Sequence, residues 1–342
     1  MQNRKPLVSI MIPNYNHGIY LDQCIQSTLN QTYENIEIVV LDNCSNDNST
    51  EIIKKYTKDG VKLLKNICNI RGDTYKVISE LTGGKYKMLL CADDYILPDF
   101  VSKSISVMEE YPNVGYVHCE KDNVTENDDI ISLDPFYNCS FIVSGEEVMP
   151  IYLLTPVASP SNGIFRTTSF EMIGGYNSLM PHVNADRTLW YYLSTISDYA
   201  YIREKLGRYR ISTNSQSSLS VLNFSGPICD YLSIKNLIDY AELKGYKKVT
   251  ERKEEAYKKI SSFCLSYVSS MLKNKNFNRA KEYLIFCKLF DSDIEKDERY
   301  LKLKKMHETK IIDTEYFKNE TNESTSRKRS YEPPNGYKKI NV

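Results

Sequence analysis

Short apolar runs alternate with longer segments of helical periodicity through the first third of the chain. The apolar runs cover residues 7–12, 36–41, 61–64 and 86–90. Between them, apolar residues recur three or four positions apart, which is the spacing of one helix face. Short strands that alternate with helices predict an α/β fold with a parallel sheet and right-handed crossovers. Because the runs are almost continuously apolar, we expect strands that are covered on both faces.

The alternation continues, with longer gaps, to about residue 225, and the pattern then changes. We predict helices over 100–108 and 144–154, strands over 114–119 and 162–166, a helix that begins at Ala185, and edge strands within 201–211. Residues 226–310 show helical periodicity and are rich in Lys and Tyr. Residues 311–342 are hydrophilic, which is typical of disorder, and they end in a short β-like cluster. The pattern therefore predicts an α/β domain over 1–225, a helical region over 226–310 and a disordered tail or linker over 311–342.

Polar residues stand at the ends of three predicted strands. Pro13-Asn14-Tyr15-Asn16 follows the first strand, Asp42-Asn43 the second and Asp93-Asp94 the fourth. We expect the third, second, first and fourth strands to be neighbours in that order, which brings these three ends side by side. In open α/β sheets the carboxyl ends of the strands line the ligand crevice. This arrangement predicts a nucleotide site.

The adjacent acids Asp93 and Asp94 are the most informative pair in the sequence. Two acids after a strand are often only the N-cap of the next helix. That interpretation weakens here because Asp42 ends a neighbouring strand, and clustered carboxylates repel one another unless a cation joins them. Mg²⁺ or Mn²⁺ is commonly held by one or two carboxylates and substrate phosphates, and a diphosphate leaving group needs such neutralisation. Tyr15 would be placed to stack on a base, whereas a loop residue such as Arg71 is more often solvated than a ligand.

The composition indicates which kind of binding partner and which cellular compartment to expect for this protein. Basic and acidic residues are equal in number, 44 each, which argues against a nucleic-acid partner. The 9 cysteines are scattered without a CxxC pair, which favours reduced thiols in a cytosol over a disulfide framework. No secretory signal is visible, and no apolar run is long enough to span a bilayer. We therefore expect a cytoplasmic protein.

Several motifs occur together in this order. They are Val8 to Asn16, Ile38 to Asn43, Ala92-Asp93-Asp94 with Pro98-Asp99, Asn162 to Arg166, Gly174-Gly175-Tyr176, and Ala185-Asp186 with Leu189-Trp190. In combination they resemble the inverting family 2 glycosyltransferases of the GT-A fold, over roughly residues 5–220. The resemblance implies a Rossmann-like, mixed and mostly parallel sheet with helices on both faces. It also implies transfer of a sugar from a nucleotide-diphosphate donor, usually a UDP-sugar, to an acceptor hydroxyl, with Mn²⁺ or Mg²⁺ as the metal.

The resemblance assigns a role to each motif residue. The nucleotide-sugar set that it implies is Pro13, Tyr15, Asn16, Asp42, Asn43, Arg71, Asp93 and Asp94, with Tyr15 and the Asp42-Asn43 pair at the nucleobase. Asp93 falls at the ribose and beside the metal, Asp94 at the metal-ligand position, and Asp186 at the general-base position. The chain departs from the family pattern at four positions: Asn43, Cys91 and Ala185 replace acids that are common there, and Ser212 replaces a His.

Other classes of protein share this kind of sheet. A sugar nucleotidyltransferase would carry a Gly-rich, Arg-containing loop after the first strand, and a dehydrogenase would carry GxGxxG there. A non-catalytic GT-A binding module is a further alternative, against which the intact acids Asp93, Asp94 and Asp186 argue. We expect a hexosyl- or N-acetylhexosaminyl-transferase of cell-surface glycan or glycoprotein synthesis, with a glycan, lipid-linked or protein acceptor.

The predicted C-terminal helices carry apolar faces of their own. Residues such as Leu237 and Ile238, and later Tyr283 and Leu284, recur at helical spacing, as in a docked helical layer or an oligomer surface. Plain structural cover for the sheet is equally consistent with this pattern. A membrane-surface role is less favoured because no strongly basic amphipathic helix stands out; peripheral membrane association is the alternative.

Overall fold

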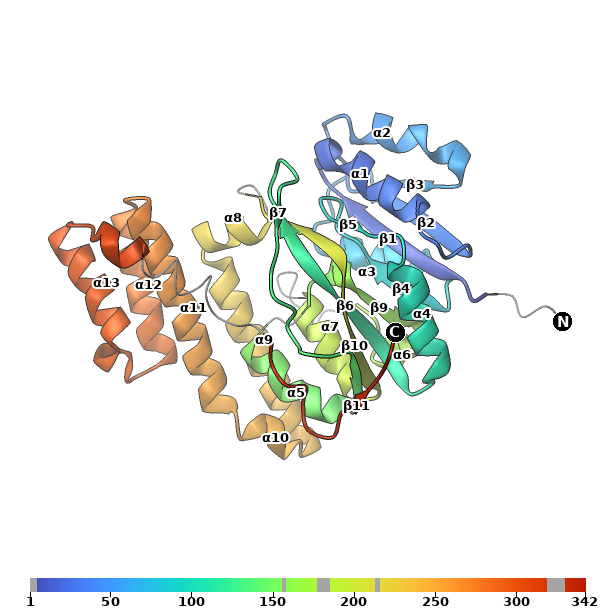
Figure 1. Cartoon of the computed structure of the whole chain (residues 1–342). Helices are drawn as coiled ribbons and strands as arrows, with labels where there is room; N and C mark the ends of the chain where they lie inside the picture. Colours follow the sequence, from blue (N-terminus) through green and yellow to red (C-terminus); the bar gives the residue numbers. More distant parts are fainter. Residues whose placement is uncertain (1–4, 156–157, 177–184, 213–215, 319–329) are drawn as a thin grey trace. The chain divides into compact units, whose positions relative to one another are not determined.

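A mixed β-sheet organises the first part of the chain (Figure 1). The structure is a computed structural model, and it describes residues 5–155, 158–176, 185–212, 216–318 and 330–342. The chain divides into two units. We call residues 1–212 with 329–342 the sheet unit and residues 213–328 the helical unit.

The elements of the sheet unit follow the predicted alternation of strands and helices. Its strands are β1 (Val8–Asn14), β2 (Ile36–Asp42), β3 (Lys62–Lys65), β4 (Tyr86–Leu89), β5 (Tyr95–Ile96), β6 (Val114–Val124), β7 (Ile130–Ile131), β8 (Phe141–Val143), β9 (Gly163–Arg166), β10 (Asp198–Arg210) and β11 (Lys338–Lys339). Its α-helices are α1 (Gly18–Leu29), α2 (Ser49–Lys55), α3 (Asp73–Glu80), α4 (Phe100–Glu110), α5 (Gly145–Leu154), α6 (Thr167–Met172) and α7 (Ala185–Ser194), and short 3₁₀ turns cover Thr57–Asp59 and Pro160–Asn162.

The strand order confirms the predicted placement of the first four strands. Among the described residues the sheet has 11 strands in the order β11-β8-β10-β6-β9-β4-β1-β2-β3, with β5 paired to β10 and β7 to β6. β1 runs parallel to β2 and β4, and β2 runs parallel to β3. β9 is antiparallel to both β4 and β6. The carboxyl ends of β1, β2 and β4 therefore meet at one edge of the sheet.

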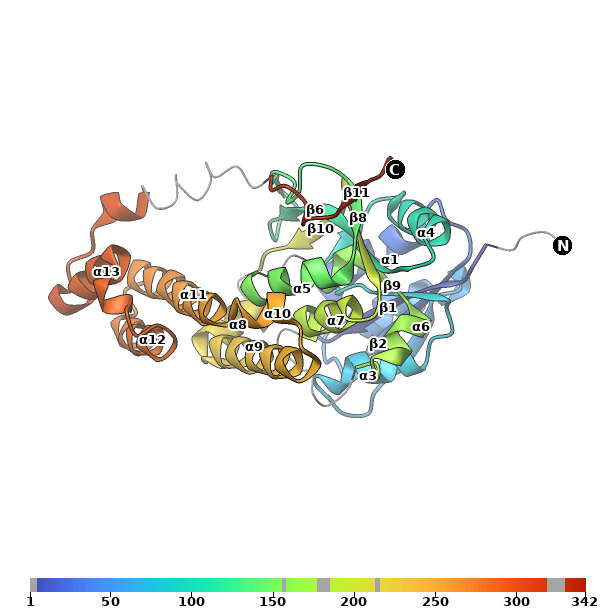
Figure 2. The ribbon, with the colours of Figure 1, turned by 90° about the horizontal axis from the view of Figure 1, so that it is seen from below.

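Helices cover both faces of the sheet, as Figure 2 shows from below. On one face, alternate strand residues such as Ile10 and Val40 share a buried core with α1, α2 and α4. On the other face, Phe165 packs on Phe170 of α6, and Tyr116 stacks on Trp190 of α7. Double-sided burial explains why these strands read as continuous apolar runs. The predicted α/β class, with a mixed sheet and helices on both of its faces, is confirmed.

Two features differ from the sequence prediction. The predicted edge strands within 201–211 form one 13-residue strand, β10, which lies inside the sheet between β8 and β6. The predicted disordered tail is wrong for residues 330–342, because Lys338 and Lys339 pair antiparallel with β8 and Ile340 is buried. A few apolar side chains in a hydrophilic segment suffice to anchor it, which average composition does not reveal. The boundary between the two units along the chain falls after residue 212, whereas the sequence predicted it after residue 225.

The helical unit confirms the predicted helical C-terminal region. Its helices are α8 (Gln216–Leu222), α9 (Ser225–Lys244), α10 (Lys247–Thr250), α11 (Lys253–Lys273), α12 (Phe277–Phe290) and α13 (Glu298–Thr309), with a 3₁₀ turn at Ile294–Lys296. Asn276 and Asp297 cap α12 and α13 by accepting backbone N–H bonds. Gly245 ends α9 in the left-handed conformation. Leu237 and Tyr283 lie in the core of this unit, whereas Leu243 and Leu289 are exposed, and the oligomer surface stays a prediction.

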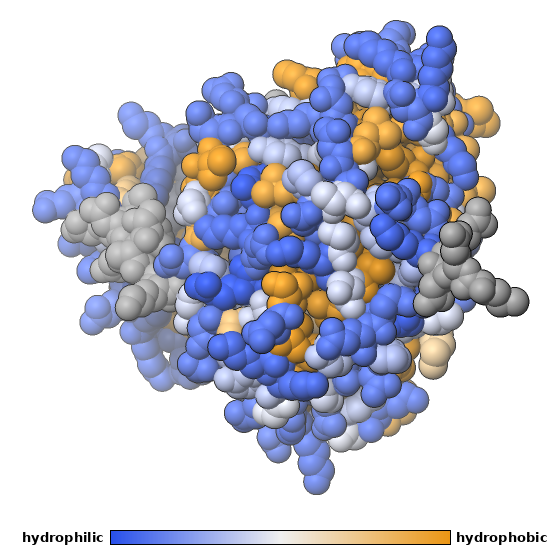
Figure 3. Space-filling model, turned by 45° about the vertical axis from the view of Figure 1, so that its right-hand side comes forward, coloured by the Kyte–Doolittle hydropathy of each residue, from blue (hydrophilic) through white to orange (hydrophobic). Residues whose placement is uncertain are grey.

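The surface is mixed in polarity. Figure 3 shows hydrophobic residues in several separate groups among hydrophilic ones on the face that it presents. Within the described ranges, every helix is too short or too polar to cross a membrane.

Candidate active site

Three ligand-type side chains converge where β4 ends. Cys91, Asp93 and Asp94 each place one sulfur or carboxylate oxygen within 4.8 Å of the others. A tight turn brings them together, in which the backbone N–H of Asp94 donates to the carbonyl of Cys91 at 3.0 Å. The sequence predicted the two acids at this position, and the structure adds the thiol.

The Asp94 carboxylate is buried and incompletely satisfied. Its Oδ1 accepts a hydrogen bond from the backbone N–H of Arg210 at 2.8 Å, while its buried Oδ2 has no hydrogen-bond partner. Burial, and then the negative charge of Asp93, raise the pKa of Asp94 to about 7. A buried carboxylate oxygen without a partner is costly unless a cation or a proton joins it. The donor set of two carboxylates and a thiol therefore fits a divalent cation.

Arg210 supports this turn from behind, and sequence reasoning did not assign it a role. Its guanidinium donates to the backbone carbonyls of Asp93 at 2.9 Å and Thr125 at 2.7 Å, and to the side chain of Gln23 at 2.7 Å. It also pairs with Asp128 and lies over the ring of Tyr20. A buried arginine with this many partners fixes the backbone on which Asp93 and Asp94 stand. The only sequence feature that could have indicated this role is the position of the arginine at the end of a predicted strand.

Asp186 lies in the first turn of α7, as predicted. Burial is the largest influence and raises its pKa, while the backbone N–H and charge of Arg187, and the charge of Lys121, act to lower it. Burial raises the pKa of the Tyr75 and Tyr176 phenols, and the negative charge of Asp186 adds to this increase. The two rings lie next to each other, with centroids 5.7 Å apart. Asp186 therefore lies near two phenol rings and under the influence of two cations, Arg187 and Lys121, a setting that suits a proton acceptor. The loop that precedes it, residues 177–184, lies outside the described residues.

Lys121 is the second residue that the sequence did not single out. It stands on β6 opposite Gly207 of β10, with its ammonium 4.0 Å from the centre of the Tyr209 ring. Its positive charge acts on both Asp94 and Asp186 and opposes, to a small extent, the increase in pKa that burial causes in each. Lys121 thus links the acidic cluster electrostatically with the candidate base.

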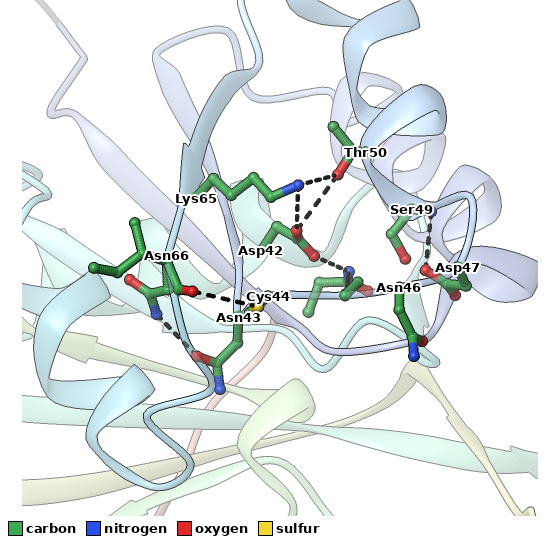
Figure 4. Close-up of polar contacts among 12 residues, drawn as sticks. Asp42, Asn43, Cys44, Asn46, Asp47, Ser49, Thr50, Lys65 and Asn66 are labelled. Carbon is green, nitrogen blue, oxygen red and sulfur yellow. Dashed lines mark hydrogen bonds and ion pairs between the residues drawn. The ribbon is translucent and has the colours of Figure 1, made fainter.

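Asp42 is inside the protein rather than on the crevice surface. It is fully buried and accepts from Asn14 Nδ2 at 3.0 Å and from Thr50 Oγ1 at 3.4 Å, with Lys65 Nζ 3.8 Å away (Figure 4). In this arrangement Asp42 shapes the wall of the site, and its predicted contact with a nucleobase stays a prediction.

Asn43 is also committed to protein partners. Its Oδ1 accepts from Asn66 Nδ2 at 2.9 Å and from the backbone N–H of Ile70 at 3.0 Å, while its Nδ2 donates to Asn69 at 2.8 Å. Both lone pairs of the amide oxygen are therefore used. This geometry does not leave Asn43 free to accept from a pyrimidine N3–H; the residue instead fixes the loop that leads to Arg71.

The remaining predicted residues line the same edge of the sheet. Pro13 is paired opposite Leu41 at the end of β1, and Tyr15 follows with 45% of its surface exposed. Asn16 has a left-handed φ of 57°, and its Oδ1 accepts from the backbone N–H of Asn46. Arg71 also has a left-handed φ, of 50°, and its side chain is exposed. An exposed ring at this edge remains available for stacking.

Solved structures share this fold. Residues 1–349 of S. aureus TarS in complex with UDP-GlcNAc superpose with a TM-score of 0.55 at 16% identity, covering 88% of this chain and 91% of that 1–349 fragment. The Pyrobaculum calidifontis mannosyltransferase in complex with GDP-Man and Mn²⁺ gives 0.53 at 12% identity, covering 91% and 89%. The chain therefore shares the fold of these two structures.

Sequence comparisons relate part of the chain to a known family. Residues 9–173, just under half of the chain, match the model described as glycosyl transferase family 2. An uncharacterized glycosyltransferase of Nostoc sp. is 26% identical over 222 residues, which cover 62% of this chain and 68% of that protein. The chain spans less than half the length of three other curated glycosyltransferases, to which it is 34–41% identical.

Proposed function

We propose that this chain is an inverting glycosyltransferase that moves a sugar from a nucleotide diphosphate to an acceptor hydroxyl with a divalent cation. The observation that carries the proposal is the acidic cluster with the unpartnered, buried Oδ2 of Asp94. A further carboxylate, that of Asp186 on α7, supports the proposal, because the positive charge of Lys121 acts on both Asp94 and Asp186. The match of residues 9–173 to the family 2 model agrees with this chemistry.

Each residue has a defined task in this proposal. Asp94, beside Asp93, holds Mn²⁺ or Mg²⁺, which when bound neutralises charge on the diphosphate leaving group. Asp186 accepts the acceptor hydroxyl proton as the new glycosidic bond forms. Tyr15 stacks on the base, and Arg71 approaches the nucleotide from its exposed loop. A single base opposite the leaving group corresponds to one displacement, and hence to inversion at the anomeric carbon.

The donor and acceptor belong to the proposal as well. A UDP-sugar is our first candidate because of the family resemblance, although the Asn43 geometry removes one reason for choosing uridine. We propose a glycan, lipid-linked or protein acceptor in cell-surface glycan or glycoprotein synthesis. All nine cysteines are free thiols, which supports a cytoplasmic site of action.

A donor panel tests the proposal. Hydrolysis of UDP-, dTDP- and GDP-sugars is measured with Mn²⁺, with Mg²⁺ and with excess EDTA, and NMR of the transfer product gives its anomeric configuration. We expect hydrolysis that depends on the cation and is lost in Asp94→Asn. Full activity in EDTA would refute the role of the cation, and a product of retained configuration would refute inversion. If no nucleotide sugar is turned over although nucleotides bind, the chain is a binding module.

A further inference from the structure

Cys91 places its thiol beside the two carboxylates, and the backbone of this residue is held by three hydrogen bonds. Its backbone N–H donates to Ser161 Oγ at 3.0 Å, and its carbonyl accepts from Asp94 N at 3.0 Å and from Cys24 Sγ at 3.6 Å. These contacts come from three different parts of the fold. The backbone at residue 91 is therefore held in place, and with it the Cβ atom from which the thiol extends toward the cluster.

The distances fit joint coordination of one ion. Metal–sulfur bonds are about 2.3 Å and metal–oxygen bonds about 2.0–2.2 Å, so two ligands of one ion lie at most about 4.5 Å apart. The three ligand atoms of this cluster lie within 4.8 Å of one another, so rotations of these side chains can bring all three onto one ion. The buried Oδ2 of Asp94, which has no hydrogen-bond partner, independently indicates a ligand at this place.

A thiol changes what the site prefers. Carboxylates alone suit hard cations such as Mg²⁺, whereas a sulfur ligand selects softer ions. We propose that Cys91 is a direct sulfur ligand of the active-site cation, so that this centre binds thiophilic ions such as Co²⁺, Zn²⁺ and Cd²⁺ in preference to Mg²⁺. The inference rests on the cation site of the proposed function and adds its coordination and selectivity.

Absorption spectroscopy of the Co²⁺-loaded full chain, without donor, tests this inference directly. We expect one equivalent of Co²⁺ to give a sulfur-to-cobalt charge-transfer band in the near ultraviolet. The band should vanish in Cys91→Ser, and calorimetric affinity for Cd²⁺ should fall at least about tenfold, since losing even an outer-shell partner costs about 10–100-fold. Affinity for Mg²⁺ should change little. Cys91→Asp should lose the band and bind Mg²⁺ more tightly, and it serves as the test if the serine variant does not fold.

Control variants exclude the other thiols near this part of the fold. Cys24→Ala, Cys44→Ser and Cys68→Ser should all keep the band, because none of these thiols is in the cluster. One equivalent of bound Co²⁺ without the band, or a band that persists in both Cys91 variants, would overturn the inference. The spectra are independent of turnover: a band without sugar transfer would uphold Cys91 and refute the proposed function, and transfer without the band would refute Cys91 alone.

Discussion

Acid should destabilise the sheet unit through one buried histidine, His118. Its ring is 1% exposed, both ring nitrogens lack a hydrogen-bond partner, and Trp190 packs edge-on at 4.4 Å. Burial, with a smaller effect of the Lys121 charge, lowers the pKa of His118 from 6.5 to about 3. The folded protein therefore keeps this ring neutral at a pH where the unfolded chain takes up a proton.

The sign and size follow from that difference in pKa. Above the unfolded pKa of about 6.5, burying the neutral ring costs no unfolding free energy through protonation. As the pH falls from about 6.5 toward 3, the unfolded chain takes up a proton that the folded protein does not, and the unfolding free energy decreases progressively. At about pH 5.0, which is about 1.5 units below the unfolded pKa, the loss is about 2 kcal/mol, at 1.36 kcal/mol per unit. Asp94, with its raised pKa of about 7, acts in the opposite direction, so the effect of His118 has to be isolated by comparison with a variant.

Urea unfolding followed by Trp190 fluorescence measures this effect. Trp190 is the only tryptophan in the sequence and it contacts His118, so its signal reports on the sheet unit. Between about pH 7.5 and 5.0, the wild type should lose about 2 kcal/mol more unfolding free energy than His118→Gln. His17→Gln, at a partly exposed position, should behave as the wild type. Equal losses in the wild type and His118→Gln would refute the reasoning.

Four further changes test the site and its supports. Asp186→Asn should lower kcat about 10²–10⁴-fold because it removes the base, with donor affinity by calorimetry unchanged; near-wild-type transfer would move the base elsewhere. Asp94→Asn should abolish cation binding, measured by Mn²⁺ titration, yet keep the fold, because it removes a buried charge; unaltered Mn²⁺ affinity would contradict the assignment. Arg210→Lys should cost at least about 2 kcal/mol of stability, since lysine cannot replace the forked hydrogen bonds, and should weaken Mn²⁺ binding as well; a loss of stability alone would make the arginine merely structural. Ile340→Ala should lower the unfolding free energy of the sheet unit by about 2 kcal/mol, whereas exposed Val342→Ala should have little effect; equal behaviour would show that the tail does not belong to the fold.

The strand ends were predictable because their pattern is local. Apolar runs that end on Asp42-Asn43 and Asp93-Asp94 define both the strands and the edge where they meet, and the position of Asp186 in a first helical turn follows from its neighbours. Parallel pairing then determines which ends are adjacent. This much of the site depends on short-range order and a general rule of topology.

The partners of those residues were not predictable, since they come from distant parts of the chain. Arg210 contacts the Asp93-Asp94 turn from β10, and Lys121 acts on Asp94 electrostatically from β6; the strand pairings that place them there are revealed by no sequence period. The amide of Asn43 is occupied by a loop more than twenty residues later. Residues 330–342 were misjudged for the same reason, because their average polarity conceals the few contacts that fix them.

The return of residues 330–342 to the sheet has a consequence for biosynthesis. The strand β11 is translated after the whole helical unit, yet it pairs with β8, which is translated much earlier. During translation, the backbone groups of β8 that later pair with β11 therefore stay unpaired until the end of the chain has been made. A waiting strand edge is a site of wrong pairing between chains, and β8 limits this exposure to three residues, Phe141–Val143. The short length of this strand protects the newly made protein from aggregation before the sheet is complete.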